Sequence, residues 1–315
     1  MSPQRKAARR LAVTAPDGVR LAAWSSGDSS RPTVLLVHGY PDTHTVWDVV
    51  AAALAKDWHV LRYDARGSGE SERPSAKAAY ELPALAGDCR AVVGAAGVEG
   101  KVHVVGHDWG SITAWEAVTA ADAAGWIASY TTISGPCLDH VAAWTRDRLR
   151  HPSPGRLAPV LRQQAKSWYL GLFQLPVLPE LAWKRALGPR WDKRLQRTEG
   201  IPADEVHTAI TLTQDALAGL NMYRANMFPR LSHRPQAKPA AAPVQFVVPL
   251  KDKYVSPGLA AAGLDWASPA WWRTIDTGHW GALITHGAQV ASWVDEFARH
   301  IDGDPESAAL AAARV

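Results

Sequence analysis

The segment Gly106-His107-Asp108-Trp109-Gly110 joins an apolar run to a helical pattern and places an aspartate between two glycines. A motif of this form, with serine at its centre, makes the strand-to-helix turn called a nucleophile elbow. The tight turn requires small residues on both sides and exposes the central side chain over the sheet edge. The N–H groups of the following helix favour a negative charge there. We therefore predict that Asp108 is a carboxylate nucleophile rather than a helix cap.

An aspartate nucleophile selects a class of substrate. Attack on a saturated carbon gives an ester, which water can cleave, whereas serine would give an ether and stay blocked. Asp108 therefore suits substrates with a leaving group on sp³ carbon, such as epoxides or alkyl halides.

A histidine near the end of the chain is the candidate general base. His279 follows the last predicted strand, and its position fits the chain order nucleophile, acid, histidine. Asp252, after the preceding strand, is the candidate orienting acid, and Asp139 is its rival. Asp276 is too close to His279 in sequence for this role and is predicted to be structural.

The segment His38-Gly39-Tyr40-Pro41 follows the first buried strand. A sharp turn there would aim the backbone N–H of Tyr40 at the same point as the N–H of Trp109. These two donors are predicted to form an oxyanion hole for ester cleavage. His38 is predicted to be a structural hydrogen-bonding residue rather than a catalyst.

Alternating strand and helix patterns must position these residues. A hairpin is expected over residues 13–24, and helices at 45–55, at 82–94 and from the elbow to about 120. Buried strands are expected at 33–37, 57–63, 101–105 and 127–133. This alternation predicts an α/β fold whose mostly parallel sheet is covered by helices on both faces.

The pattern changes after residue 136. No strand pattern appears over 137–238, where helices are expected at 156–171 and 204–222. Strands resume at 244–249 and 272–275, and a last helix is expected at 288–300. We therefore predict a core in two parts (1–136 and 239–302), an inserted helical cap (137–238) and an Ala-rich tail (303–315) that frays. Tryptophans between 168 and 191 suggest an aromatic-lined apolar cavity in the cap.

The composition argues against several classes of protein. The chain has 315 residues, is 47% hydrophobic and 20% charged, and carries a formal net charge of +4, so no nucleic-acid partner is expected. Its two cysteines match no metal or redox spacing, and neither a metal nor a cofactor is expected. No stretch approaches the ~18 apolar residues of a membrane span, and no signal peptide is expected. A cytoplasmic location is the default interpretation.

Together these segments resemble the soluble epoxide hydrolase family of the α/β-hydrolase fold, over roughly residues 12–300. The matching motifs lie at residues 38–41, 106–110, 251–252 and 278–280. More narrowly, HGYPDTHTVWD and ISGPCLDH look similar to the hydrolase part of actinobacterial proteins that join such a domain to a short-chain dehydrogenase. Without a dehydrogenase part, this chain is expected to be a free-standing relative or one domain of a fusion. Ser111 departs from the glycine or alanine of many members but should not disturb the chemistry.

The resemblance also implies two cap tyrosines that hydrogen-bond the epoxide oxygen. The segments WYLGLFQ (168–174) and LNMYR (220–224) look like those that bear them, which gives Tyr169 and Tyr223. The implied activity opens a small apolar epoxide to a vicinal diol. It proceeds through an ester on Asp108, which is cleaved by water that His279 activates.

Two other functions stay open. A haloalkane or haloacid dehalogenase shares the Asp and His steps, but it often binds halide through an asparagine at the place that Tyr40 occupies here. A non-catalytic ligand-binding protein would not need Asp108, Asp252 and His279 together. The tyrosine pair favours the epoxide. The sequence leaves open whether the protein is a monomer or a dimer.

Overall fold

The computed structural model describes residues 8–232 and 236–315, and its eight strands form a single sheet in the order β1-β2-β4-β3-β5-β6-β7-β8. The strands are β1 (Arg9–Thr14), β2 (Arg20–Ser26), β3 (Thr33–Val37), β4 (His59–Tyr63), β5 (Val102–His107), β6 (Ile127–Ile133), β7 (Val244–Pro249) and β8 (Ala270–Ile275). β1 pairs antiparallel with β2, and β2 with β4, while the other neighbours are parallel. The predicted hairpin and mostly parallel sheet are confirmed.

Alternate residues of the central strands face two separate layers of helices. Val34 and Leu36 of β3 pack in one apolar cluster with α1 and α11, whereas Leu35 and Val37 pack in another with α2 and α3. Every residue of β3, β5 and β7 is buried, as expected for strands that are covered on both faces. The core helices are α1 (Asp48–Leu54), α2 (Leu82–Ala95), α3 (Trp109–Val118), α10 (Pro257–Ala260), α11 (Gly287–Ile301) and α12 (Ala308–Ala312).

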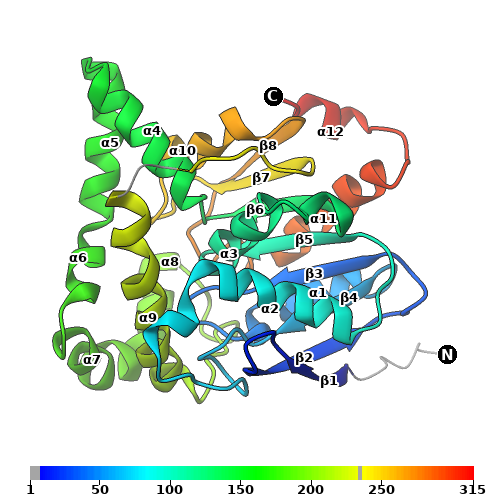
Figure 1. The fold of residues 1–315 in the computed structure, drawn as a ribbon, viewed down its shortest axis with the longest axis horizontal. Helices are drawn as coiled ribbons and strands as arrows, with labels where there is room; N and C mark the ends of the chain where they lie inside the picture. The colour runs from blue at the N-terminus through cyan, green and yellow to red at the C-terminus, as the bar shows by residue number, and fades with distance from the viewer. Residues whose placement is uncertain (1–7, 233–235) are drawn as a thin grey trace.

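The chain between β6 and β7 contains only helices and their connections among its described residues. These helices gather at one side of the molecule, beyond the ends of the sheet (Figure 1). They are α4 (Leu138–Arg150), α5 (Pro154–Lys166), α6 (Trp168–Gln174), α7 (Leu178–Ala182), α8 (Trp191–Glu199) and α9 (Leu212–Ser232), with a π-helical turn at Trp183–Leu187 and a 3-10 turn at Gly188–Arg190. In the part of the chain that the structure describes, no helix is long and apolar enough to cross a membrane.

One cap helix lies later in the chain than predicted. The expectation was a helix over 204–222, whereas α9 begins at Leu212 and ends at Ser232. None of residues 204–211 is buried, while ten residues of α9 are buried. A helix is stabilised mainly by packing an apolar face, so one at 204–211 would gain little.

The expectation that residues 303–315 fray is wrong. The tail forms α12, whose Leu310 is fully buried against Trp271 and Phe297. The backbone N–H of Trp272 donates to the carbonyl of Ala313 at 2.7 Å, and that of Val315 donates to the carbonyl of Ala270 at 3.0 Å. β8 is the last strand of the sheet, so the tail covers backbone groups that an edge strand would otherwise leave unpaired.

The buried tail predicts a loss of stability on truncation of one side chain. Leu310→Ala should lower the free energy of unfolding by about 2–4 kcal/mol, because it removes a buried side chain and leaves a cavity. Urea unfolding followed by circular dichroism measures the change. Val315→Ala, at a residue that is 67% exposed, is the control and should shift the value by less than about 0.5 kcal/mol. Equal effects of both substitutions would mean that the tail does not pack as described.

Candidate active site

Asp108 stands at the turn between β5 and α3 in a backbone conformation that side chains rarely adopt. Its φ is 52° and its ψ is −123°. The flanking glycines are required by space: a Cβ on Gly106 would lie 2.6 Å from the Cα of Ser111, and one on Gly110 would lie 2.1 Å from the carbonyl oxygen of Val37. The tight turn predicted from the motif is therefore present, and its strain is held by close packing.

The loop after β3 approaches Asp108 closely. The backbone N–H of Tyr40 donates to Asp108 Oδ1 at 2.7 Å, and a Cβ on Gly39 would lie 2.4 Å from the Cβ of Asp108. Trp109 is the first residue of α3, so its N–H has no acceptor within the helix. The N–H of Tyr40, one of the two expected oxyanion donors, thus points at the carboxylate. The other donor, the N–H of Trp109, follows Asp108 directly in the chain.

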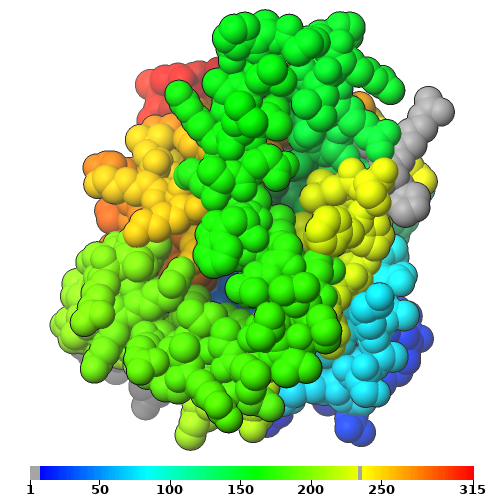
Figure 2. Space-filling model, turned by 90° about the vertical axis from the view of Figure 1, so that its left-hand side faces the viewer, coloured from blue at the N-terminus to red at the C-terminus, as the bar shows by residue number. Residues whose placement is uncertain are grey.

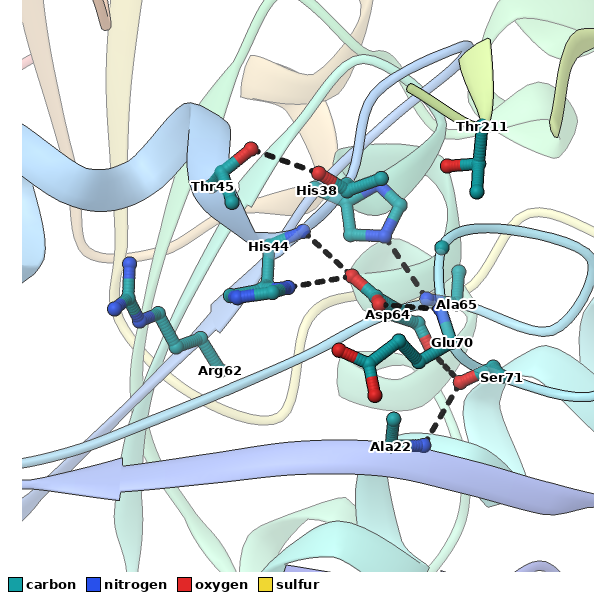
Figure 3. A network of polar contacts seen from close by, with 12 residues as sticks. Ala22, His38, His44, Thr45, Arg62, Asp64, Ala65, Glu70, Ser71 and Thr211 are labelled. Atoms are coloured by element: carbon teal, nitrogen blue, oxygen red, sulfur yellow. Dashed lines mark hydrogen bonds and ion pairs between the residues drawn. The ribbon is translucent and has the colours of Figure 1, made fainter. Parts of the chain in front are cut away.

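A buried polar network around Asp64 holds the loop that follows β3 (Figure 3). Asp64, after β4, accepts hydrogen bonds from the backbone N–H and the Nδ1 of His44 at 2.8 and 2.7 Å and from the N–H of Glu70 at 2.9 Å. Burial acts to raise the pKa of Asp64, but its bonds with His44 outweigh burial and hold the pKa below its usual value. His38 donates from Nδ1 to the carbonyl of Gly39 and accepts from the N–H of Ala65, so its contacts are those of a structural residue.

The structure brings His279 between two carboxylates. His279 Nε2 lies 3.5 Å from Asp108 Oδ2, and its Nδ1 lies 2.9 Å from Asp252 Oδ2. The other oxygen of Asp252 accepts the N–H groups of Tyr254 and Val255 at 2.7 and 3.0 Å. These three side chains follow β5, β7 and β8, so the carboxyl ends of three strands build one constellation.

The pKa shifts follow from these contacts. Burial acts to lower the pKa of His279, but the charge of Asp252 and the hydrogen bonds with Asp108 and Asp252 hold it well above the ordinary value. Burial acts to raise the pKa of Asp252, and His279 together with the two N–H groups overcomes it and lowers the pKa. These contacts therefore favour the charged forms of both His279 and Asp252.

The rival acids lie elsewhere. Asp139 accepts a hydrogen bond from Arg230 at 2.8 Å and another from the backbone N–H of Gln236 at 3.1 Å. Asp276 forms a solvent-exposed ion pair with Lys251 at 2.9 Å. Neither carboxylate contacts His279, which leaves Asp252 as the partner of the imidazole.

Two side chains that hold the histidine loop were not predicted from the sequence. His107 Nε2 donates to the carbonyl of His279 at 3.0 Å, and burial lowers the pKa of His107 to about 3. Glu199, the last residue of α8, accepts the backbone N–H of Trp280 at 3.1 Å, and a Cβ on Gly278 would lie 2.1 Å from its Oε2. His107 stands inside the elbow motif, but no local signal identifies Glu199, which reaches the loop from the cap.

A cavity of about 560 Å³ opens over Asp108. This volume is typical of small-molecule sites. Its walls come from the elbow, from α4, α5, α6 and α9 of the cap and from the loop after β7. A larger hollow of about 720 Å³ lies apart, beside α2 and α3, and is lined by charged groups that include Arg90, Glu116 and Arg230.

Both predicted cap tyrosines line the same cavity as Asp108. The rings of Tyr169 and Tyr223 lie 6.2 Å apart, and Tyr223 packs on Trp109 at 4.9 Å. Burial and then the charge of Asp108 raise the pKa of Tyr169 well above its usual value, and burial does the same for Tyr223. Both phenols therefore stay protonated. Tyr254, which the sequence did not single out, also lines the cavity and packs on Tyr169 at 5.7 Å.

The expected aromatic lining is only partly correct. Trp168 lines the cavity, whereas Trp183 and Trp191 are buried and pack on each other at 5.2 Å. Trp191 then packs on Trp280 beside the histidine loop. These two tryptophans join the cap to the core instead of contacting the cavity.

Known proteins share both the sequence pattern and the fold. The family model for the alpha/beta hydrolase fold matches residues 32–284. The probable oxidoreductase EphD of Mycobacterium tuberculosis (strain H37Rv) is 37% identical over 307 residues, which cover 96% of this chain and 52% of the relative. Epoxide hydrolase A of the same strain is 40% identical over 102 residues, which cover 32% of this chain and 31% of that protein. The chain thus spans about half the length of EphD.

Solved structures agree on the fold. A mutant epoxide hydrolase from Bacillus megaterium, complexed with its naphthyloxy-propanediol product, has a TM-score of 0.73 at 20% identity, covering 92% of this chain and 99% of that one. A putative acyltransferase from Salmonella enterica also reaches 0.73, at 18% identity, covering 96% and 98%. The fold alone therefore does not name the reaction. The sequence matches and the architecture together show that this chain belongs to the α/β-hydrolase fold family and is related to epoxide hydrolases.

Proposed function

We propose that the protein is an epoxide hydrolase that opens an apolar epoxide to a vicinal diol through an ester on Asp108. The observation that carries the proposal is the shared cavity, in which the Asp108 carboxylate and the phenols of Tyr169 and Tyr223 line one largely apolar space. An epoxide needs a nucleophile at carbon and a donor at oxygen at the same time. We also propose that residues 137–238 act as the cap that supplies the donors.

In the first step, one carboxylate oxygen of Asp108 attacks a ring carbon while the C–O bond of the ring breaks. The released electron pair stays on the epoxide oxygen, which takes hydrogen bonds from both phenols and then a proton from one of them, leaving a phenolate. Tyr169 and Tyr223 suit this role because both phenols remain protonated in the buried cavity. Preorganised donors of this kind are most effective where water is excluded.

The first step prepares the base for the second. At rest the negative charge of Asp108 helps to keep the His279 proton in place. Ester formation removes that charge, so the pKa of His279 falls, and its proton passes through water to the phenolate left by the first step. Neutral His279, oriented by Asp252, then activates water. The hydroxide attacks the ester carbonyl, the oxyanion is stabilised by the N–H groups of Tyr40 and Trp109, and the diol leaves as the proton on His279 is restored.

Removing the base should trap the ester. In His279→Gln, the protein should form the ester on Asp108 but cleave it at least about 10²-fold more slowly, because only the second step needs a general base. Intact-protein mass spectrometry during turnover should show an adduct with the mass of the epoxide.

Asp108→Asn is the matched control and should show no adduct at early times. Peptide mapping of the trapped protein should place the adduct on Asp108. If His279→Gln stays unmodified with substrate present while retaining its fold, either the base or the ester is assigned wrongly.

Substitution of the two cap tyrosines tests whether the substrate is an epoxide or a halide. Tyr169→Phe and Tyr223→Phe should each slow alkylation of Asp108 by about 10²-fold or more, which is the loss expected for one oxyanion donor of roughly 2–4 kcal/mol. Ester cleavage should change much less, because it depends on backbone donors. Stopped-flow tryptophan fluorescence can separate the steps, since Trp109 and Trp144 line the cavity.

Tyr40→Phe is the control, because its phenol donates to the carbonyl of Ala216 on α9 and not into the cavity. It should leave alkylation within about threefold of wild type. Wild-type alkylation rates in both cap variants would show that the tyrosines are not the donors, and halide release from haloalkanes without epoxide turnover would replace the proposal with a dehalogenase.

Glu199 is proposed as a positioning residue for His279. Glu199→Ala removes the acceptor of the Trp280 N–H and should slow ester cleavage by roughly tenfold to 10²-fold, because a loosened base is misplaced. Glu199→Gln keeps an acceptor oxygen and should retain most of the rate. Alkylation in single-turnover experiments should be nearly unchanged in both variants. A purely structural role would instead lower both steps and the thermal midpoint together.

A further inference from the structure

The cap exposes large apolar side chains on its outer side. Of the twelve large hydrophobic residues that are exposed in the described part of the chain, nine lie in the cap and six lie within one stretch of 21 residues. Trp168 is 70% exposed and Leu161 is 67% exposed. Single exposed apolar residues are common, but their concentration in one segment indicates an interaction surface. We call these six residues the cap apolar face: Leu161, Trp168, Leu175, Val177, Leu178 and Leu181.

The six residues come from consecutive segments of the cap. Leu161 lies on α5 and Trp168 on α6, which are separated only by Ser167, and the other four residues lie in the connection to α7 or on α7 itself. α7 follows α6 at the same edge of the molecule, farthest from the sheet (Figure 1). Figure 2 looks onto this side, where the green cap helices run from top to bottom across the surface.

The cap is also basic, although the whole chain is not. Residues 137–238 contain 16 Lys and Arg and 8 Asp and Glu, a net charge of +8, which leaves −4 for the rest of the chain. Arg162, Lys184 and Arg185 lie in or beside the cap apolar face and are exposed. None of the three forms an ion pair with another described residue, so their charges are available to a partner.

We propose that the cap apolar face docks on an anionic lipid surface. Apolar side chains that enter the headgroup region, surrounded by Lys and Arg that meet anionic headgroups, are the two elements of peripheral membrane binding. A second copy of the chain fits less well. A twofold interface would bring the same basic residues face to face, which costs free energy through like-charge repulsion.

The docking surface is continuous with the candidate active site. Trp168 belongs to the cap apolar face and also lines the 560 Å³ cavity, together with Leu170 and Gly171 of the same helix. An apolar molecule dissolved in the bilayer could therefore pass along α6 toward Asp108 without crossing bulk water. This extension rests on the proposed function, and it specifies the substrate class as epoxides that partition into membranes.

The docking proposal is tested by flotation of the whole protein with vesicles. Vesicles of phosphatidylcholine and phosphatidylglycerol in a 7:3 ratio should carry the protein at low ionic strength, and pure phosphatidylcholine should carry much less. The triple variant Arg162→Gln, Lys184→Gln, Arg185→Gln should bind at least tenfold more weakly, since each basic residue near an anionic surface contributes about fivefold. The variant Leu178→Ser should also bind more weakly.

A matched control removes the same charge from the core. Lys56→Gln, Lys77→Gln and Lys101→Gln together should leave vesicle binding close to wild type, because these exposed lysines lie in core segments. Equal losses in the two triple variants would mean that only net charge matters and would overturn the proposal. No vesicle binding by wild type would also overturn it. So would concentration-dependent dimers in sedimentation that Leu178→Ser dissociates, because the face would then be a self-association interface.

Turnover of a water-soluble epoxide separates this proposal from the proposed function. The Arg162/Lys184/Arg185 variant and Leu178→Ser should keep that activity while they lose vesicle binding, and they should lose activity toward an epoxide presented in the vesicles. Vesicle binding without any epoxide turnover would refute the reaction but keep the docking surface.

Discussion

The interaction on which the rest of the site depends is the buried chain of charges from Asp108 through His279 to Asp252. His279 and Asp252 are each only 1% exposed, so neither charge could persist there without a partner. Each carboxylate also accepts backbone N–H groups, from Tyr40 at one end and from the loop after Asp252 at the other. Three segments far apart in sequence must therefore be placed to within a few tenths of an ångström.

The parallel sheet meets this requirement because it brings strand ends together. β5 and β7 lie on either side of β6, and β8 is beside β7, so the loops that follow them emerge on one edge. Gly39 and Gly110 then allow backbone and side chain to approach closer than any Cβ would permit. The parallel sheet therefore brings the three candidate catalytic side chains together from three separate loops.

The difference between local motifs and long-range contacts explains what could be predicted from the sequence. The elbow and its two glycines are a local pattern, and chain order points from Asp108 to Asp252 and His279, so the chemistry could be located before the fold was known. Glu199 could not, because its contact with Trp280 joins residues 81 positions apart and no motif requires it. The prediction that the tail frays was wrong for a similar reason. An Ala-rich segment looks weakly ordered until Leu310 is seen to fill a space beside Trp271.

The net charge of the whole chain does not show how the charges are distributed along it. A net charge of +4 suggested no charged partner, yet it is the difference between a basic cap and a slightly acidic core. The cavity in the cap also bears on the proposed reaction. In the proposed reaction, the largely apolar cavity would strengthen the hydrogen bonds of the phenols to the epoxide oxygen while the ring opens. In the proposed mechanism, esterification of Asp108 removes its charge and so breaks its ionic contact with His279. The attraction between Asp108 and His279 is then lost when His279 must give up its proton, so in this proposal the same interaction stabilises the resting site and, by its loss, lowers the pKa of the base for the second step.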